Sequence, residues 1–413
     1  MALWKRVICG VDGMIDMTKL EHKEYELTCI APIHIGNGEV LRNFEYIYIN
    51  NRGKYKAIFL DKTKWADFLI RNDLLDAYVS YVEQGKVALW DWLKRQTKIR
   101  NLDQQVKQLT DSTAMAYPHT DVKKTLNDVA RQIKTVQGVP YIPGSSIKGA
   151  LRSAILYYLI KQHPQSYQPI WQEVKQVIET HQGRKYKNNQ LQYIANELEN
   201  FAFTKLPNHG KRADNALQSV MKGIRVSDAM VTAGSKDTVI IQKMDNSKKR
   251  GEALHEHFIS LFRECIPAGT MLRFSITMDK EIMDYINIHS LDELWEMSRK
   301  YVEDSVIMQK EIFGKVYQAE FKKAELADIF LGGGPGFLSK TAYYALAPKD
   351  EGKKILARYF DDIFTNTNRR TKQREPAHYH VRDDDKITPR TLKLAMTDNE
   401  CWLMGIASVR EIR

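Results

Sequence analysis

Residues 140–159, with the sequence PYIPGSSIKGALRSAILYYL, constrain the fold more than any other stretch of the chain. The two prolines favour an extended lead-in, and Gly144 then allows the backbone to turn. Apolar side chains recur at every fourth position after this turn, which predicts an amphipathic helix with one buried face. We expect Ser145 or Ser146 to cap the first turn of that helix. The apolar positions are Ile147, Leu151, Ile155 and Leu159.

Lys148 and Arg152 place two positive charges one helical turn apart, close to the helix start. The helix dipole is already positive there, so the two cations are favourable when an anion binds beside them. A phosphate would satisfy both side chains and the free backbone N–H groups together. The alternative is an ordinary capped helix whose two basic residues are solvated, and spacing alone leaves both interpretations open.

The composition indicates a basic chain large enough for several domains. Its 413 residues suffice for two or three domains, and the net charge of +11 is compatible with a nucleic acid or another polyanion as partner. The four cysteines lie far apart and form no CxxC pair, which argues against a disulfide framework and predicts a reducing, cytoplasmic location. No apolar run is long enough to cross a bilayer, so we expect no membrane partner.

Helical and strand patterns are mixed along the chain. Alternating apolar residues at 23–29 predict a first strand, and the runs on either side of Asn-Asn-Arg-Gly at 50–53 predict a hairpin. This mixture favours an α+β fold, and two ferredoxin-like (RRM-like) halves would fit its order. Further predicted elements are a helical piece at 122–136, a second hairpin around 267–270, a long helix at Leu291–Phe313, and a last strand pair near 391–396 and 401–409.

We divide the chain into an N-terminal tail at 1–20 and two domains. The N-terminal domain at 21–250 carries two polar, charged segments, about 83–138 and 161–215, which we interpret as helical insertions. The C-terminal domain at 251–413 contains a glycine-rich loop at 332–336.

This loop, Gly332-Gly333-Gly334-Pro335-Gly336, is the sharpest local anomaly in the sequence. So many glycines expose backbone N–H groups and permit left-handed conformations, as in phosphate-binding nests. A Walker A loop that ends at Lys340 is a competing interpretation, but Ser339 occupies the position of its last glycine. A tight turn that packs on a neighbouring segment is a third.

Several histidines are candidates for chemistry. His34 lies in a loop with two glycines and could act as the general acid or base of a metal-independent ribonuclease, although hydrogen bonding or stacking is the commoner role. The His-x-His pairs at 255–257 and 378–380 have no third ligand at metal spacing, so we expect no metal site and no cofactor. Asp228 is expected to orient a neighbour or to cap a helix.

Five motifs follow one another in an order that resembles the RAMP superfamily of CRISPR RNA-binding proteins. They are IHIGNGE, YIPGSSIKGALR, RVSDA, RECIPAGT and LGGGPGFLSKT. The last motif and the ending ITPRTLKLAM…CWLMGIASV are most similar to the Csm-type terminal subunit of the type III-A interference complex. The resemblance spans about residues 22–409, but the polar segments 83–138 and 161–215 take no part in it.

The resemblance implies two RAMP domains that bind crRNA in the groove between them. It implies a non-catalytic subunit that caps the backbone filament near the crRNA 3′ end and supports crRNA maturation in antiviral defence. The implied partners are crRNA, the backbone RAMP subunits and host nucleases that trim the crRNA.

A metal-independent crRNA-processing endoribonuclease that uses His34 is the alternative function, and a P-loop-like NTPase is a weaker one. Residue patterns and resemblance together give a set of candidate RNA-binding residues. The set is Gly144, Ser145, Ser146, Lys148, Gly149, Arg152, His34, Arg42, Gly332, Gly333, Gly334, Gly336, Phe337 and Lys340.

Overall fold

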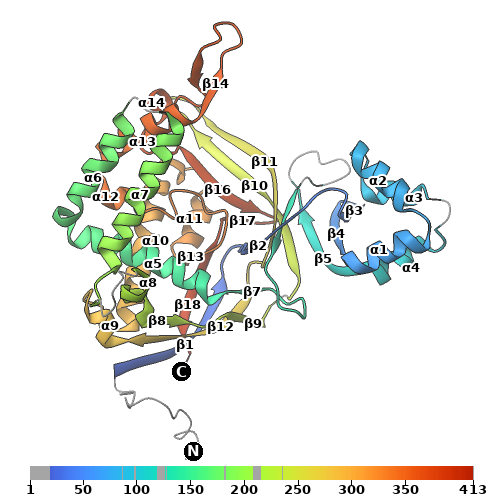
Figure 1. Ribbon diagram of the computed structural model, residues 1–413, viewed down its shortest axis with the longest axis horizontal. Helices are drawn as coiled ribbons and strands as arrows, with labels where there is room; N and C mark the ends of the chain where they lie inside the picture. Colours follow the sequence, from blue (N-terminus) through green and yellow to red (C-terminus); the bar gives the residue numbers. More distant parts are fainter. Residues whose placement is uncertain are drawn as a thin grey trace, which may run out of the picture.

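Two large β-sheets, a small two-stranded sheet and the helices around them make up the described part of the protein (Figure 1). The computed structural model describes residues 19–85, 87–96, 99–118, 126, 128–180, 183–207, 215–234 and 236–412. Helices alternate with mainly antiparallel strands, which confirms the predicted α+β class. Within these described ranges, no helix is both long enough and apolar enough to span a membrane. The predicted tail at 1–20 lies almost wholly outside them.

The first sheet is centred on β1 (Leu20–Cys29), which confirms the predicted first strand. β1 pairs antiparallel with β12 (Met271–Asp279) on one side and with β18 (Ile406–Glu411) on the other. β9 (Ala229–Ala233) follows β12, so the strands lie in the order β18, β1, β12, β9. Shorter strands extend this sheet: β7 (Tyr141–Ile142), β8 (Ile224–Val226) and β13 (Ile329–Phe330).

Two helices complete a ferredoxin-like unit on this sheet. α5 (Gly144–Gln162) and α10 (Leu291–Phe313) both form where the sequence predicts helices. In chain order β1, α5, β9, β12, α10 and β18 give the β-α-β-β-α-β pattern of that motif. The apolar stripe of α5 is buried in the same core as Leu27 and Ile276, and each such side chain contributes about 1.5–3 kcal/mol of burial free energy.

The second sheet runs in the order β2, β6, β11, β10, β5, β4, β3, with β16 and β17 attached to β10. The predicted hairpin at 50–53 is confirmed as β3–β4, and its two turn residues, Arg52 and Gly53, have the positive φ angles that such turns need. The strands are β2 (Gly36–Leu41), β3 (Tyr46–Asn51), β4 (Lys54–Leu60), β5 (Thr110–Tyr117), β6 (Val129–Gln132), β10 (Thr238–Lys248), β11 (Leu254–Cys265), β16 (Thr391–Met396) and β17 (Cys401–Leu403).

One predicted strand pairing is wrong and another is confirmed only in part, because the chain passes between sheets at those points. The turn at 267–270 joins β11 of the second sheet to β12 of the first, so it closes no hairpin. The run 401–409 breaks at Gly405, whose φ is +79°, so that β17 pairs with β16 while β18 pairs with β1. Alternation identifies a strand correctly, but it does not specify the partner of that strand.

The predicted domain boundary near residue 250 does not separate the two sheets. It falls in the turn between β10 and β11, which pair with each other, and each sheet takes strands from both sides of it. The segment 161–215 supplies the helices α6 (Pro164–Glu179) and α7 (Arg184–Phe203).

The segment 83–138 is only partly helical, because the chain returns there to the second sheet. It contains helices but also β5 and β6, so the helix predicted at 122–136 is wrong at 129–132. In Figure 1 the helices of this segment and the two helices that precede it form a lobe beside the second sheet. The helices of this lobe are α1 (Lys62–Arg71), α2 (Leu75–Gln84), α3 (Leu89–Lys94) and α4 (Leu102–Leu109).

A buried carboxylate, Glu264 of β11, ties three strands of the second sheet together. Its side chain is fully buried. It accepts from Arg131 Nε at 2.7 Å, from Lys134 Nζ at 2.6 Å and from Thr238 Oγ1 at 2.6 Å. Burial alone would raise the pKa of Glu264, but the two cations and the hydrogen bonds outweigh burial and hold the pKa below its usual range.

Replacing Glu264 with Gln is expected to lower the free energy of unfolding by about 3 kcal/mol at pH 7. The half-buried Lys134 then loses its carboxylate partner, and the buried Arg131 keeps only the Asp111 carboxylate, at 3.8 Å. Since the folded-state pKa is depressed, this contribution is present above the unfolded pKa and is lost as the pH falls through the folded pKa. Urea unfolding at several pH values measures the difference in free energy of unfolding between wild type and the variant. This difference should become smaller in acid. Glu24→Gln, at an exposed position, is the control. A stability difference that does not change with pH would contradict the role given to the Glu264 carboxylate.

Candidate nucleic-acid interface

The start of α5 is capped by a carboxylate and not by either predicted serine. The backbone N–H of Gly144 donates to Asp228 Oδ1 at 2.8 Å, and no serine side chain caps the helix. A Cβ atom at Gly144 would lie 2.2 Å from the carbonyl oxygen of Val226, so only glycine fits this approach. The predicted capping role of Asp228 is thereby confirmed, and its carboxylate supplies one anion at the positive end of the helix.

The two basic residues of α5 have different surroundings. Arg152 hydrogen-bonds Glu199 of α7, and its guanidinium lies 5.4 Å from the centre of the Phe203 ring. Burial lowers the pKa of Lys148, and the nearby charges of Arg152 and Arg225 lower it further. Among the described residues no carboxylate pairs with Lys148, so this cation is available to an anion and Arg152 is already engaged.

The glycine-rich loop follows β13 and packs tightly against the loop that carries His34. Gly332 has φ +73°, and a Cβ atom there would lie 2.1 Å from the His34 carbonyl oxygen, which accepts from Gly333 N at 2.8 Å. Cβ atoms at Gly334 and Gly336 would meet side-chain atoms at 2.2 and 2.6 Å. Packing therefore requires three of these four glycines, as the tight-turn interpretation expected.

A cavity of about 470 Å³ lies where this loop meets α5 and α10. Five of the candidate residues line it: Ser146 and Gly149 from α5, and Gly332, Gly333 and Lys340 from the loop. The two segments are almost 200 positions apart in the sequence, so the fold brings the two predicted sites to one place.

Lys340 supplies a positive charge at the cavity wall. Although the residue as a whole is exposed, its ammonium group turns back and donates to the carbonyl oxygen of Gly332. The partial burial of this ammonium lowers the pKa of Lys340. Because a single neutral carbonyl holds it, an incoming anion offers the ammonium a stronger, charge-assisted partner.

The other candidate residues lie outside the cavity wall. Ser145 is exposed, and Gly144 is buried beneath the helix start. Arg42 follows β2 and is exposed, and its backbone N–H donates to Glu45 Oε2 at 2.8 Å. Phe337 lines a neighbouring apolar cavity, with its ring 6.1 Å from that of Phe360.

His34 has the geometry of a structural histidine. It is buried, and its Nδ1 lies 2.6 Å from the backbone carbonyl oxygen of Glu264. Burial lowers the pKa of His34, and the charge of Arg263 lowers it further, so the imidazole is neutral at pH 7 and Nδ1–H donates to that carbonyl. Nε2 faces Gly36, where a Cβ atom would lie 3.2 Å away.

Arg263 of β11 is a site residue that sequence reasoning missed. A Cβ atom at Gly333 would lie 3.9 Å from Arg263 Nε, so the guanidinium is next to the glycine loop. Its Nη1 is buried, and no described residue forms a hydrogen bond with it. An arginine in an alternating strand is usually solvated, so no pattern in the sequence marks this position.

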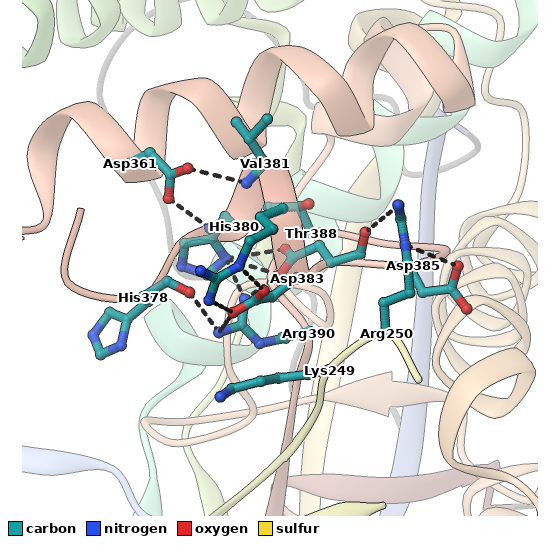
Figure 2. Close-up of polar contacts among 12 residues, drawn as sticks. Lys249, Arg250, Asp361, His378, His380, Val381, Asp383, Asp385, Thr388 and Arg390 are labelled. Atoms are coloured by element: carbon teal, nitrogen blue, oxygen red, sulfur yellow. Dashed lines mark hydrogen bonds and ion pairs between the residues drawn. The ribbon is translucent and has the colours of Figure 1, made fainter. Parts of the chain in front are cut away.

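The His-x-His pair at 378–380 belongs to an ion-pair network (Figure 2). His380 Nδ1 lies 3.0 Å from Asp384 Oδ2, and Arg390 forms an ion pair with the same carboxylate. Arg390 Nη2 also donates to the His378 carbonyl oxygen at 2.7 Å. In the described part of the chain no three potential metal ligands cluster together.

Comparison with known proteins gives consistent matches along most of the chain. The RAMP superfamily model matches residues 26–336. A protein named CRISPR system Cms protein Csm5, from Mycobacterium tuberculosis (strain CDC 1551 / Oshkosh), is 25% identical over 411 residues, which cover 94% of this chain and 97% of that protein. The protein of the same name from Enterococcus italicus is 23% identical over 377 residues, covering 83% and 86%.

One solved structure has a similar fold over nearly the whole chain. It is a chain in the cryo-EM structure of a Csm–crRNA–target RNA ternary complex of a type III-A CRISPR-Cas system. The TM-score is 0.57 at 18% sequence identity, and the match covers 94% of this chain and 100% of that chain.

Replacing Gly332 with Ala is expected to destabilise the protein by about 1–3 kcal/mol, because the new Cβ would clash with the His34 carbonyl and the positive φ is strained for alanine. Thermal unfolding measures the loss. Gly149→Ala is the matched control, since Gly149 lines the same cavity but a Cβ there meets no atom within 4 Å. Equal melting temperatures for the two variants would contradict this account of the loop contact.

Proposed function

The chain belongs to the RAMP superfamily, and from this premise we propose that it is a crRNA-binding, Csm5-type subunit of a type III-A CRISPR effector. In this role it caps the filament of backbone RAMP subunits near the crRNA 3′ end and supports crRNA maturation in antiviral defence. Its partners are the crRNA, the backbone subunits and the nucleases that trim the crRNA. Similarity to Csm5 proteins over nearly the whole chain supports the proposal.

The observation that carries the proposal is the convergence of α5 and the glycine loop on one cavity. Gly149 lets a ligand approach the backbone closely, since a Cβ atom there would meet no atom within 4 Å, and Lys340 supplies charge. Backbone groups and lysine read phosphate without reading bases. A subunit that holds a guide RNA needs this kind of contact, since base pairing supplies the sequence specificity of the complex.

Arg263 supports the same conclusion from another direction. Its Nη1 is buried beside the glycine loop and has no hydrogen-bond partner in the described part of the chain. A buried donor that stays unsatisfied costs about 1–3 kcal/mol. Phosphate oxygens accept two parallel bonds from a guanidinium, so a bound RNA backbone would remove this cost.

The surroundings of His34 and of the loop that ends at Lys340, the two candidates for catalysis, fit a non-catalytic role. His34 is neutral, and Nδ1 is committed to the Glu264 carbonyl. A P-loop needs a long helix directly after its lysine, but α12 (Tyr343–Leu346) has only four residues. Ser339 is buried and hydrogen-bonded to Gln309.

Replacing Lys340 with Ala is expected to weaken binding of single-stranded RNA about tenfold, because a charge-assisted phosphate contact is lost. The slope of log K against log salt should become shallower by about 0.7 for each lost phosphate contact. Arg263→Ala should act in the same way, and fluorescence anisotropy over a salt series measures both. Arg71→Ala is the internal control, since Arg71 is on α1, does not line this cavity and is paired with Asp67. Unchanged slopes in the Lys340 and Arg263 variants would remove this cavity from the proposal.

The endoribonuclease alternative makes a separate prediction. Purified protein incubated with crRNA repeat RNA in EDTA is expected to leave the RNA intact, because the pKa of His34 is lowered and its Nδ1 is held by a carbonyl. Gel analysis of the labelled RNA is the measurement. Site-specific cuts that vanish in the His34→Ala variant would establish the endoribonuclease in place of the proposed function.

A further inference from the structure

A second basic surface projects from the body of the protein. β14 (Thr365–Thr367) and β15 (Arg374–Pro376) form a separate two-stranded sheet, which stands out at the top of Figure 1. We call residues 365–376 the basic hairpin. Its basic side chains are all exposed, and none of them forms an ion pair with another described residue. These side chains are Arg369, Arg370, Lys372 and Arg374.

A polar cavity of about 510 Å³ lies at the base of this hairpin. Thr365, Thr367 and Arg374 line one side of it, and Arg184 and Lys187 of α7 line the other. It shares no lining residue with the cavity at the glycine loop.

The charges at this cavity are not all neutralised. Lys187 is buried and is held by Asp362, at 2.5 Å, and by the Ile178 carbonyl oxygen, at 2.7 Å. Arg184 and Arg374, by contrast, are exposed and have no carboxylate partner among the described residues. Asp362, the carboxylate that lines this cavity, is paired with Lys187, so Arg184 and Arg374 leave an excess of positive charge there. Together with the two lining threonines of the hairpin, this excess suits a phosphate.

An exposed aromatic ring lies beside these charges. Phe364, immediately before β14, is 40% exposed, and the Arg184 guanidinium lies 5.9 Å from its ring centre. Tyr186, on the same helix as Arg184, is 44% exposed. Single-stranded nucleic acids bind where positive charge follows the backbone and aromatic rings stack on bases.

The hairpin is fixed firmly to the body at its C-terminal end. Figure 2 shows Asp361 accepting from the backbone N–H groups of His380 and Val381, at 2.6 and 3.0 Å. The Ala377 N–H donates to the Phe364 carbonyl oxygen at 2.7 Å, which closes the hairpin base. Because the base is held in this way, the hairpin presents its charges from a defined position.

We propose that the basic hairpin and the first turn of α7 form a second RNA-binding surface, which holds a single-stranded segment continuous with the strand in the glycine-loop cavity. This inference rests on the proposed function and adds a site to it. Guanidiniums, hydroxyls and stacking rings together fit the phosphates and bases of RNA. An acidic protein would use the charges but would leave the threonines and rings without a role.

The triple variant Arg369→Gln, Arg370→Gln, Lys372→Gln tests the surface in the full-length protein. Uridine oligonucleotides of about 8 and about 30 nucleotides serve as probes, since single-strand sites commonly cover about 4–16 nucleotides. We expect the variant to bind the long RNA about tenfold more weakly and the short RNA as wild type does. The salt slope for the long RNA should become shallower by about 2, from three lost contacts at about 0.7 each.

The matched control removes the same charge elsewhere, as Lys54→Gln, Lys64→Gln, Lys107→Gln on or beside the α1–α4 lobe, and should leave long-RNA binding unchanged. An equal loss in both triple variants would overturn the proposal, because the effect would then come from net charge. The proposal would also be overturned if the hairpin variant bound the long RNA as tightly as wild type does. It would likewise be overturned if the variant lost binding to poly-glutamate but kept binding to the long RNA. None of these outcomes bears on the Lys340 and Arg263 tests, so failure here is distinguishable from failure of the proposed function.

Discussion

The contacts of Glu264 connect the framework of the protein to its candidate RNA site. The buried carboxylate draws Arg131, Lys134 and Thr238 to one point in the second sheet. The backbone carbonyl of the same residue accepts from His34, and the His34 carbonyl in turn accepts from Gly333 at the cavity wall. Glu264 and His34 thus connect the ion cluster to the ligand cavity through a chain of three hydrogen bonds. A buried charge of this kind is costly when it is unpaired, which makes the local geometry strongly determined.

The elements that the sequence predicts well are those whose pattern is local. The helix after Gly144, the long helix at Leu291–Phe313 and the β3–β4 hairpin carry their signals within one stretch of chain. The pairing of strands is not local, and for that reason the turn at 267–270 could not be recognised as a crossing between sheets. Period-two alternation says which face of a strand is buried and nothing about its neighbour.

The same distinction applies to the candidate site. Glycine density marked the 332–336 loop, and the helix start marked Ser146 and Gly149. Partners were harder to predict: a capping role was expected for Asp228 without the helix that it caps, and the contact of Glu199 with Arg152 was not expected. The sequence carries no signal for Arg263, because this residue stands out only through the burial of its unpaired Nη1 among the described residues of the folded protein. Spacing can thus point to a positive site, but only the three-dimensional contacts show which charges remain available.

The pairing of β1 with β18 has a consequence for how the protein is made. A strand near the N-terminus finds one of its two neighbours only after almost the whole chain has left the ribosome. Until then one edge of β1 carries unpaired backbone groups, and exposed edges of this kind invite pairing with other chains. The ferredoxin-like unit is therefore complete only when its last strand has paired. A chain that ends before residue 406 would keep one edge of β1 unpaired and prone to aggregation.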